Sequence, residues 1–149
     1  MTFEEYREFY LNNIINTSLS ENIHQIDAFI NDVTDMLIND FNLINDISLC
    51  DFEWRNGNKS FKSMKIDAYS VDVVSNTVNL LVADYNNEDI HNITNEDKNN
   101  MSSLMLNFFE NALKGFFRGT EQSAVYTQAA IEIIRNIESI DKIHLFIVS

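Results

Sequence analysis

Two acidic residues, Asp67 and Asp84, stand in strongly apolar surroundings near the middle of the chain. Asp67 lies in a run rich in β-branched and aromatic residues, and Asp84 ends a nearly continuous apolar run that begins at Val78. The polar pair Ser75-Asn76 separates the two runs, which predicts two antiparallel strands. A carboxylate beside a buried strand is costly unless it is paired or bound to something. The two aspartates are therefore the first candidates for a functional site.

Carboxylates on two neighbouring strands are suited to binding a divalent cation. Mg²⁺ prefers hard oxygen ligands and often takes only one or two protein carboxylates. The ion would also offset the repulsion between two carboxylates held close together. The structural alternative is that Asp67 is satisfied by a nearby lysine or a backbone N–H, and that Asp84 caps the loop that follows it.

Other kinds of site have little support in the sequence. His24, His91 and His144 share no metal-ligand spacing, and the three glycines form no phosphate-binding loop. Cys50 is the only cysteine and has no surrounding pattern typical of a nucleophile, so we expect it to be a small buried apolar residue. A lone cysteine also excludes an internal disulfide and fits a reducing compartment.

Length and composition indicate one soluble domain. The chain has 149 residues, of which 45% are hydrophobic and 22% are charged. It contains no apolar run near the roughly 20 residues that span a bilayer, and its N-terminus has no secretory signal. We therefore expect a cytoplasmic location and no membrane partner.

The net charge of −13 is unevenly distributed along the chain. Up to Trp54 the only basic residue is Arg7, and acids are frequent. Four of the ten basic residues then follow within a short segment: Arg55, Lys59, Lys62 and Lys65. Overall acidity disfavours unaided nucleic-acid binding. The basic segment is either a local contact for nucleic acid or a solvated hairpin tip.

Two amphipathic helices are predicted before the candidate site. Phe3, Tyr6, Tyr10 and Ile14 recur at helical spacing and predict a helix over residues 3–15. The spacing of Ser18 and Glu21 matches a capping box, and an apolar stripe follows it. The second helix is therefore expected to run from this capping box to about Asn39.

Three strands are predicted next, over residues 48–55, 60–73 and 77–85. Asn56-Gly57 is a strong signal for a tight hairpin between the first two. The third is apolar throughout, so we expect it to be central in the sheet. Alternation in the middle strand assigns its residues to two faces: Met64, Ile66, Ala68 and Ser70 on one, and Lys65, Asp67 and Tyr69 on the other.

Two helices and a final strand complete the predicted fold. A helix begins at Thr94 and carries an apolar stripe to Phe116, which we interpret as core and not as a cofactor site. A further helix extends from Val125 to Ile137, and residues 142–148 form an apolar strand. The order α-α-β-β-β-α-α-β predicts an α/β (α+β) fold with a mixed sheet of about four strands and helices on its faces.

This order, with one acid inside the second strand and another ending the third, resembles the restriction-endonuclease-like nucleases of the PD-(D/E)xK type. The resemblance implies that Asp67 and Asp84 hold Mg²⁺ for phosphodiester hydrolysis and that the backbone carbonyl of Tyr85 is a further ligand. The lysine position of the pattern falls on Asn86, which cannot supply a positive charge.

Three runs narrow the resemblance to one family. They are KIDAYSVDVVSNTVNLLVADYNNED, ITNEDKNNMSSLMLNFFENALKG and IDKIHLFIVS. Together they resemble the N-terminal domain of AIPR proteins, the abortive-infection phage-resistance proteins of bacteria. The resemblance implies that residues 1–149 form a single nuclease-like N-terminal domain in phage defence, with the C-terminal remainder of a longer parent protein as a partner.

The sequence leaves three functional hypotheses. The first is a nuclease-like module of a phage-defence protein, either an active magnesium-dependent enzyme or a catalytically degenerate one. The second is a non-catalytic interaction or oligomerisation domain, for instance a homodimer. The third is a nucleic-acid binder that uses Arg55, Lys59, Lys62 and Lys65.

Overall fold

The computed structural model describes residues 2–21, 24–40, 47–55, 57–84 and 94–148. Within these ranges no helix combines the length and apolar character that crossing a membrane requires. The order of helices and strands agrees with the predicted order. The elements are α1 (Phe3–Glu21), α2 (Gln25–Asp35), the π-helical turn η1 (Met36–Asp40), β1 (Ser48–Trp54), β2 (Met64–Asp72), β3 (Thr77–Ala83), α3 (Asn95–Leu113), the 3-10 turn η2 (Phe116–Gly119), α4 (Val125–Arg135) and β4 (Lys142–Val148).

The sheet has four strands in the order β1-β2-β3-β4. The pairs β1–β2 and β2–β3 are antiparallel, whereas β3 and β4 are parallel. All seven residues of β3 are buried. The predicted mixed sheet with a central third strand is therefore confirmed, while the restriction-endonuclease-like fold stays a prediction.

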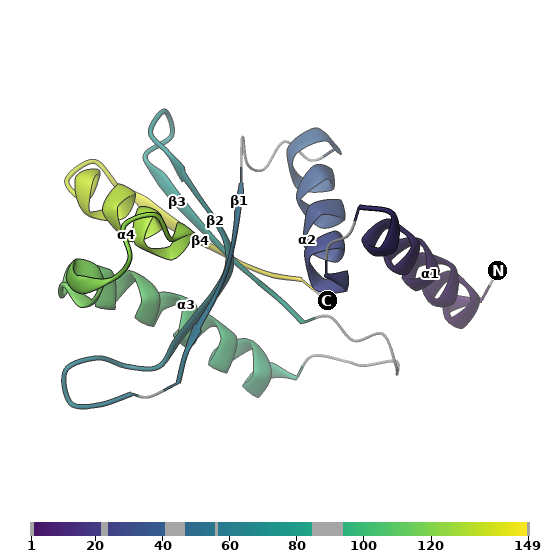
Figure 1. Cartoon of the computed structure of the whole chain (residues 1–149), viewed down its shortest axis with the longest axis horizontal. Coiled ribbons are helices and arrows are strands. Elements are labelled where there is room, and N and C mark those ends of the chain that lie inside the picture. Colours follow the sequence, from purple (N-terminus) through teal and green to yellow (C-terminus); the bar gives the residue numbers. More distant parts are fainter. Residues whose placement is uncertain (1, 22–23, 41–46, 56, 85–93, 149) are drawn as a thin grey trace.

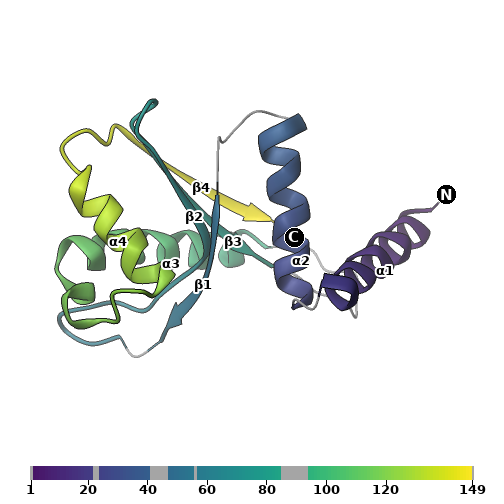
Figure 2. The same ribbon diagram turned by 45° about the horizontal axis from the view of Figure 1, so that its top comes forward.

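Helices cover both faces of this sheet (Figure 1). α3 and α4 lie on one face, and α2 lies on the other, with α1 outside α2 (Figures 1 and 2). Each face has its own apolar core. The α3/α4 core includes Ile66, Leu80 and Phe108, and the α1/α2 core includes Ile30 and Leu81.

The start of α3 is confirmed at the residue that the sequence predicts. The Thr94 hydroxyl accepts a hydrogen bond from the Asp97 N–H at 3.1 Å, and the Asp97 carboxylate accepts one from the Thr94 N–H at 3.2 Å. This reciprocal pair satisfies two donors at the helix start. The predicted stripe extends beyond the helix, because Gly115 adopts a φ of 93° and places Phe116 in η2.

The predicted boundary between the first two helices is wrong. α1 continues through Ser18 to Glu21, and α2 begins after His24, which makes no side-chain capping bond. The Ser18 hydroxyl is buried within α1 and donates to the Ile15 carbonyl at 2.9 Å. A serine that bonds back to its own helix does not act as an N-cap, so the capping-box spacing was misleading.

The predicted hairpin of the first two strands forms, because β1 and β2 pair antiparallel as far as Trp54 and Met64, but its connection is longer than predicted. β1 ends at Trp54 and β2 begins at Met64, so residues 55–63 form a longer connection. Asn56 lies outside the described residues. Within this connection the Asn58 side chain accepts hydrogen bonds from the backbone N–H groups of Ser60 and Phe61, which forms a turn that competes with strand pairing.

Candidate active site

The side chains of β2 do not alternate regularly between the two faces of the sheet as predicted, because the alternation is broken at Asp67. Met64 and Ile66 belong to the α3/α4 core, as expected, but Ala68 packs in the α1/α2 core and Tyr69 returns to the first. Regular alternation would have placed Ala68 with Ile66. The strand therefore has an irregularity at Asp67, which interrupts the regular two-face pattern.

β1 carries a bulge directly opposite this irregularity. The pairing runs from Leu49 with Ala68 to Phe52 with Ile66, so Cys50 and Asp51 together oppose Asp67. Asp51 has a φ of 48°, a left-handed conformation that aspartate tolerates better than most residues. Bulges are frequent beside active sites because they redirect side chains. Here the bulge coincides with the residue that the sequence singles out.

The Asp67 carboxylate is held against β3. Its Oδ2 accepts a hydrogen bond from the backbone N–H of Ala83 at 2.8 Å, and the residue is only 4% exposed. The backbone pairing of β2 with β3 ends at Ala68 and Leu81, and beyond it the Asp67 side chain bonds to β3 in place of the backbone. Among the described residues, no hydrogen bond is made by the other carboxylate oxygen, Oδ1.

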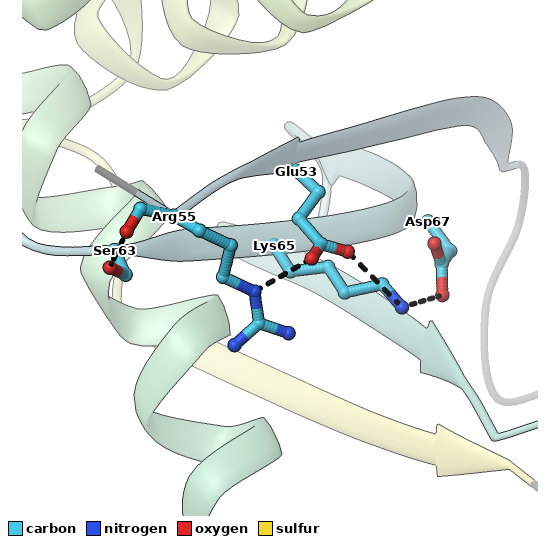
Figure 3. Close-up of polar contacts among 5 residues, drawn as sticks. All are labelled: Glu53, Arg55, Ser63, Lys65 and Asp67. Carbon is cyan, nitrogen blue, oxygen red and sulfur yellow. Dashed lines mark hydrogen bonds and ion pairs between the residues drawn. The ribbon is translucent and has the colours of Figure 1, made fainter. Parts of the chain in front are cut away.

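A chain of opposite charges connects Asp67 to β1 (Figure 3). The Lys65 Nζ lies 4.0 Å from Asp67 Oδ2 and 3.8 Å from Glu53 Oε2. The other oxygen of Glu53 accepts a hydrogen bond from Arg55 Nε at 2.7 Å. Lys65 is therefore a cation placed between two carboxylates, and its side chain is 23% exposed, so solvent still reaches it.

Burial and neighbouring acids raise the pKa values of two aspartates at this site. Burial raises the pKa of Asp67, and the Ala83 N–H and Lys65 partly offset this effect. The pKa of Asp51 is raised from 3.8 to about 6, first by burial and then by a hydrogen bond with, and repulsion from, Asp27 of α2. The site thus extends from β2 across β1 to α2.

We predict that the raised pKa of Asp51 makes the folding stability depend on pH. Between pH 3.8 and about 6 the folded protein holds a proton on Asp51 that the unfolded chain has lost. The contribution of Asp51 to the free energy of unfolding therefore falls as the pH rises through this range. Asp51→Asn removes this contribution and keeps a residue that tolerates the left-handed backbone.

Urea denaturation at pH 4, 5, 6 and 7 measures this effect as a difference between variants. From pH 4 to pH 7 the free energy of unfolding should decrease less in Asp51→Asn than in the wild type. Asp51 is an exposed residue, so solvent screening keeps this difference small. Asp141→Asn, at an exposed site on another part of the surface, should follow the wild type. Parallel curves for wild type and Asp51→Asn would contradict the assignment.

Cys50 is half-buried beside two acids of the site, whereas the sequence predicts a buried apolar residue. Burial, together with repulsion from Asp51 and Asp67, raises the pKa of its thiol to about 12. The thiol therefore stays protonated at neutral pH, and the thiolate is the nucleophilic form of cysteine.

Asp84 directly follows Ala83, which is the last residue of β3 and the hydrogen-bond partner of Asp67. It is half-buried, and its backbone N–H donates to the Val148 carbonyl of β4. The hydrogen bond between Asp67 and Ala83 therefore brings the two predicted acids to the same end of the sheet. Tyr85 and Asn86, the other two predicted positions, lie outside the described residues.

The acidic side chains at this end of the sheet are ligands of the kind that Mg²⁺ prefers, but there are too few of them among the described residues to complete a site. Asp67 and Asp84 offer carboxylate oxygens, the ligands that this ion prefers. The described residues contain no group of three or more histidine, cysteine or acidic side chains that could hold a metal. An ion here would therefore take most of its ligands from water and from substrate phosphates, as Mg²⁺ often does.

Residues 29–149 match the family described as the abortive infection phage resistance protein N-terminal domain. The chain belongs to this family. The match begins within α2 and includes all four strands, so it covers both Asp67 and Asp84. No curated protein and no solved structure matches the chain. The predicted phage-defence assignment is therefore confirmed at the level of the family.

The structure adds three residues to the site of this family member. The sequence places Lys65 in the basic segment and predicts it on the same strand face as Asp67, but assigns it no catalytic role. In the sequence, Glu53 and Asp51 are only two of the many acids in the first half of the chain. The lysine stands two positions before Asp67, so regular strand alternation already placed the two side chains on one face. The bulge that aligns Asp51 with Asp67 has no clear sequence signal.

Proposed function

We propose that this domain is the metal-dependent nuclease module of a phage-defence protein, and that Lys65 supplies the positive charge missing at Asn86. The observation that carries the proposal is the position of Lys65 Nζ, 4.0 Å from the buried carboxylate of Asp67. A cation beside a metal-binding carboxylate is what phosphodiester hydrolysis requires, since negative charge develops on the phosphate and the leaving oxygen.

Each residue then has a defined role. Asp67 and Asp84 would hold Mg²⁺, which when bound polarises the phosphate and makes a water more acidic. Asp67 is oriented by the Ala83 N–H, so its free oxygen Oδ1 has a fixed direction. Lys65 would stabilise the charge that builds up on the phosphate. Glu53 keeps the Lys65 ammonium near Asp67 by attracting it from the side of β1.

The exposed basic residues of the β1–β2 connection give a first contact for the nucleic-acid backbone. Lys59 and Lys62 are exposed, and Arg55 lies beside the site through its bond to Glu53. The net charge of −13 repels nucleic acid elsewhere on the surface. Binding should therefore be local and should weaken steeply as the salt concentration rises.

We predict that Lys65→Met lowers the Mg²⁺-dependent or Mn²⁺-dependent cleavage of DNA or RNA by about a hundredfold. Methionine keeps the length and much of the apolar stem of lysine but has no charge. Lys65→Arg should retain more activity, because it restores the charge. Lys114→Met removes an exposed lysine at the end of α3 and should leave the rate unchanged.

Cleavage by the purified wild-type chain, measured with single-stranded and double-stranded DNA and RNA, decides between the outcomes. Activity that needs the metal and is lost in Lys65→Met supports the proposal. Full activity in Lys65→Met would show that the lysine has no catalytic role. A wild-type chain that cleaves none of these substrates with either metal would contradict the proposal itself.

A further inference from the structure

β4 presents an unpaired backbone edge in the part of the chain that the structure describes. The strand is last in the sheet order, and its parallel pairing with β3 is continuous from Lys142 to Val148. The Lys142 N–H and the Val148 carbonyl both point toward β3, since they bond to Asn76 and Asp84. In a parallel strand the N–H and C=O of one residue point to the same side, alternating along the strand.

The backbone groups of three residues therefore point away from the sheet: Ile143, Leu145 and Ile147. No hydrogen bond to this side is made among the described residues. These three side chains pack against the α3/α4 core and are half-buried. An apolar edge with unpaired donors and acceptors is a template for a further strand.

The other edge strand of the sheet, β1, has features that prevent pairing with another chain, and β4 lacks them. β1 is interrupted by its bulge and carries the acids Asp51 and Glu53. Bulges and charged residues on an edge strand prevent pairing with another chain. β4 has no bulge and no acid, and its polar residues are only Lys142 and His144. In a chain of net charge −13, β4 is thus an edge where two copies can meet without opposing strand carboxylates.

We propose that β4 pairs with β4 of a second copy of this chain, in antiparallel orientation about a two-fold axis at Leu145. In this register Leu145 lies opposite itself, and Ile143 lies opposite Ile147. The three outward-facing residues of each copy then form hydrogen-bonded pairs along the whole edge. A second copy fits better than an unrelated peptide because the pairing removes two exposed edges at once. The proposal does not depend on nuclease activity.

Sedimentation of the purified full chain tests the proposal. We expect a dimer that becomes tighter as the salt concentration rises, because salt screens the repulsion between two acidic copies. Leu145→Pro removes an outward-facing N–H without removing a bond to β3, and proline is tolerated on edge strands. This variant should dimerise at least about tenfold more weakly, a change of about 1.4 kcal/mol. A monomeric wild type, or a folded Leu145→Pro variant that dimerises as tightly as the wild type, would overturn the proposal.

Oxidative cross-linking tests the register and does not depend on how well Leu145→Pro folds. In a Cys50→Ser background, Leu145→Cys places two thiols on the two-fold axis. The expected Cα separation of about 5.5 Å for a hydrogen-bonded pair is within the range for a disulfide. Leu106→Cys, at an exposed position on α3, is the matched control. A covalent dimer at position 145 alone supports the register, and equal cross-linking at both positions overturns it.

Discussion

Asp67→Asn should lower metal-dependent cleavage by about a thousandfold while leaving the fold intact. Asparagine has nearly the same size as aspartate, and its carbonyl oxygen can still accept the hydrogen bond from the Ala83 N–H. It has no charge, so it can neither hold Mg²⁺ as a carboxylate does nor pair with Lys65. The variant therefore separates the chemical role of Asp67 from its structural role. Its measurement is the cleavage rate at saturating Mg²⁺ or Mn²⁺.

Asp67→Ala is the matching variant that removes both roles. It leaves the Ala83 N–H without its acceptor in a buried part of β3, which costs about 1–3 kcal/mol of unfolding free energy. In Asp67→Asn no such loss is expected, because the carbonyl oxygen of asparagine still accepts the hydrogen bond from the Ala83 N–H. Full activity in Asp67→Asn would show that this carboxylate is not a metal ligand.

Hydrophobic patterns predicted the framework around Asp67 because they depend on local spacing. The continuous apolar run of β3 predicted a central strand, and the structure buries all of it. The Thr94 capping signal and the apolar stripe predicted α3 and its core face. Residues that recur with the period of a helix or strand are fixed by burial alone, so single-sequence reasoning finds them.

The direction in which the Asp67 carboxylate points could not be predicted from hydrophobic spacing. It results from an irregularity in β2 and a bulge in β1, two features that lie opposite each other only once the two strands pair. The bulge has no glycine, since Asp51 adopts the left-handed conformation itself. Lys65 was missed as a site residue for a related reason, because one of its two partners, Glu53, lies on β1 and approaches it only once β1 and β2 pair.

Phe108→Ala should destabilise the protein by about 3–5 kcal/mol, the usual cost of removing a buried phenylalanine. Phe108 is fully buried on α3, and its ring packs edge-on against Phe52 of β1 and obliquely against Phe117. Domains of this size have total stabilities of about 5–15 kcal/mol, so the variant loses a large part of its margin. Urea denaturation measures the loss.

Leu106→Ala on the same helix is the control, because Leu106 is 39% exposed and its truncation should cost only about 0.5 kcal/mol. Equal losses at the two positions would contradict a core role for the stripe on α3. The pair also distinguishes packing from chemistry at the site. Phe108 contacts the sheet on the side of the α3/α4 core, so any cleavage lost in Phe108→Ala should follow the folded fraction. Cleavage lost in Asp67→Asn should not, since that variant stays folded.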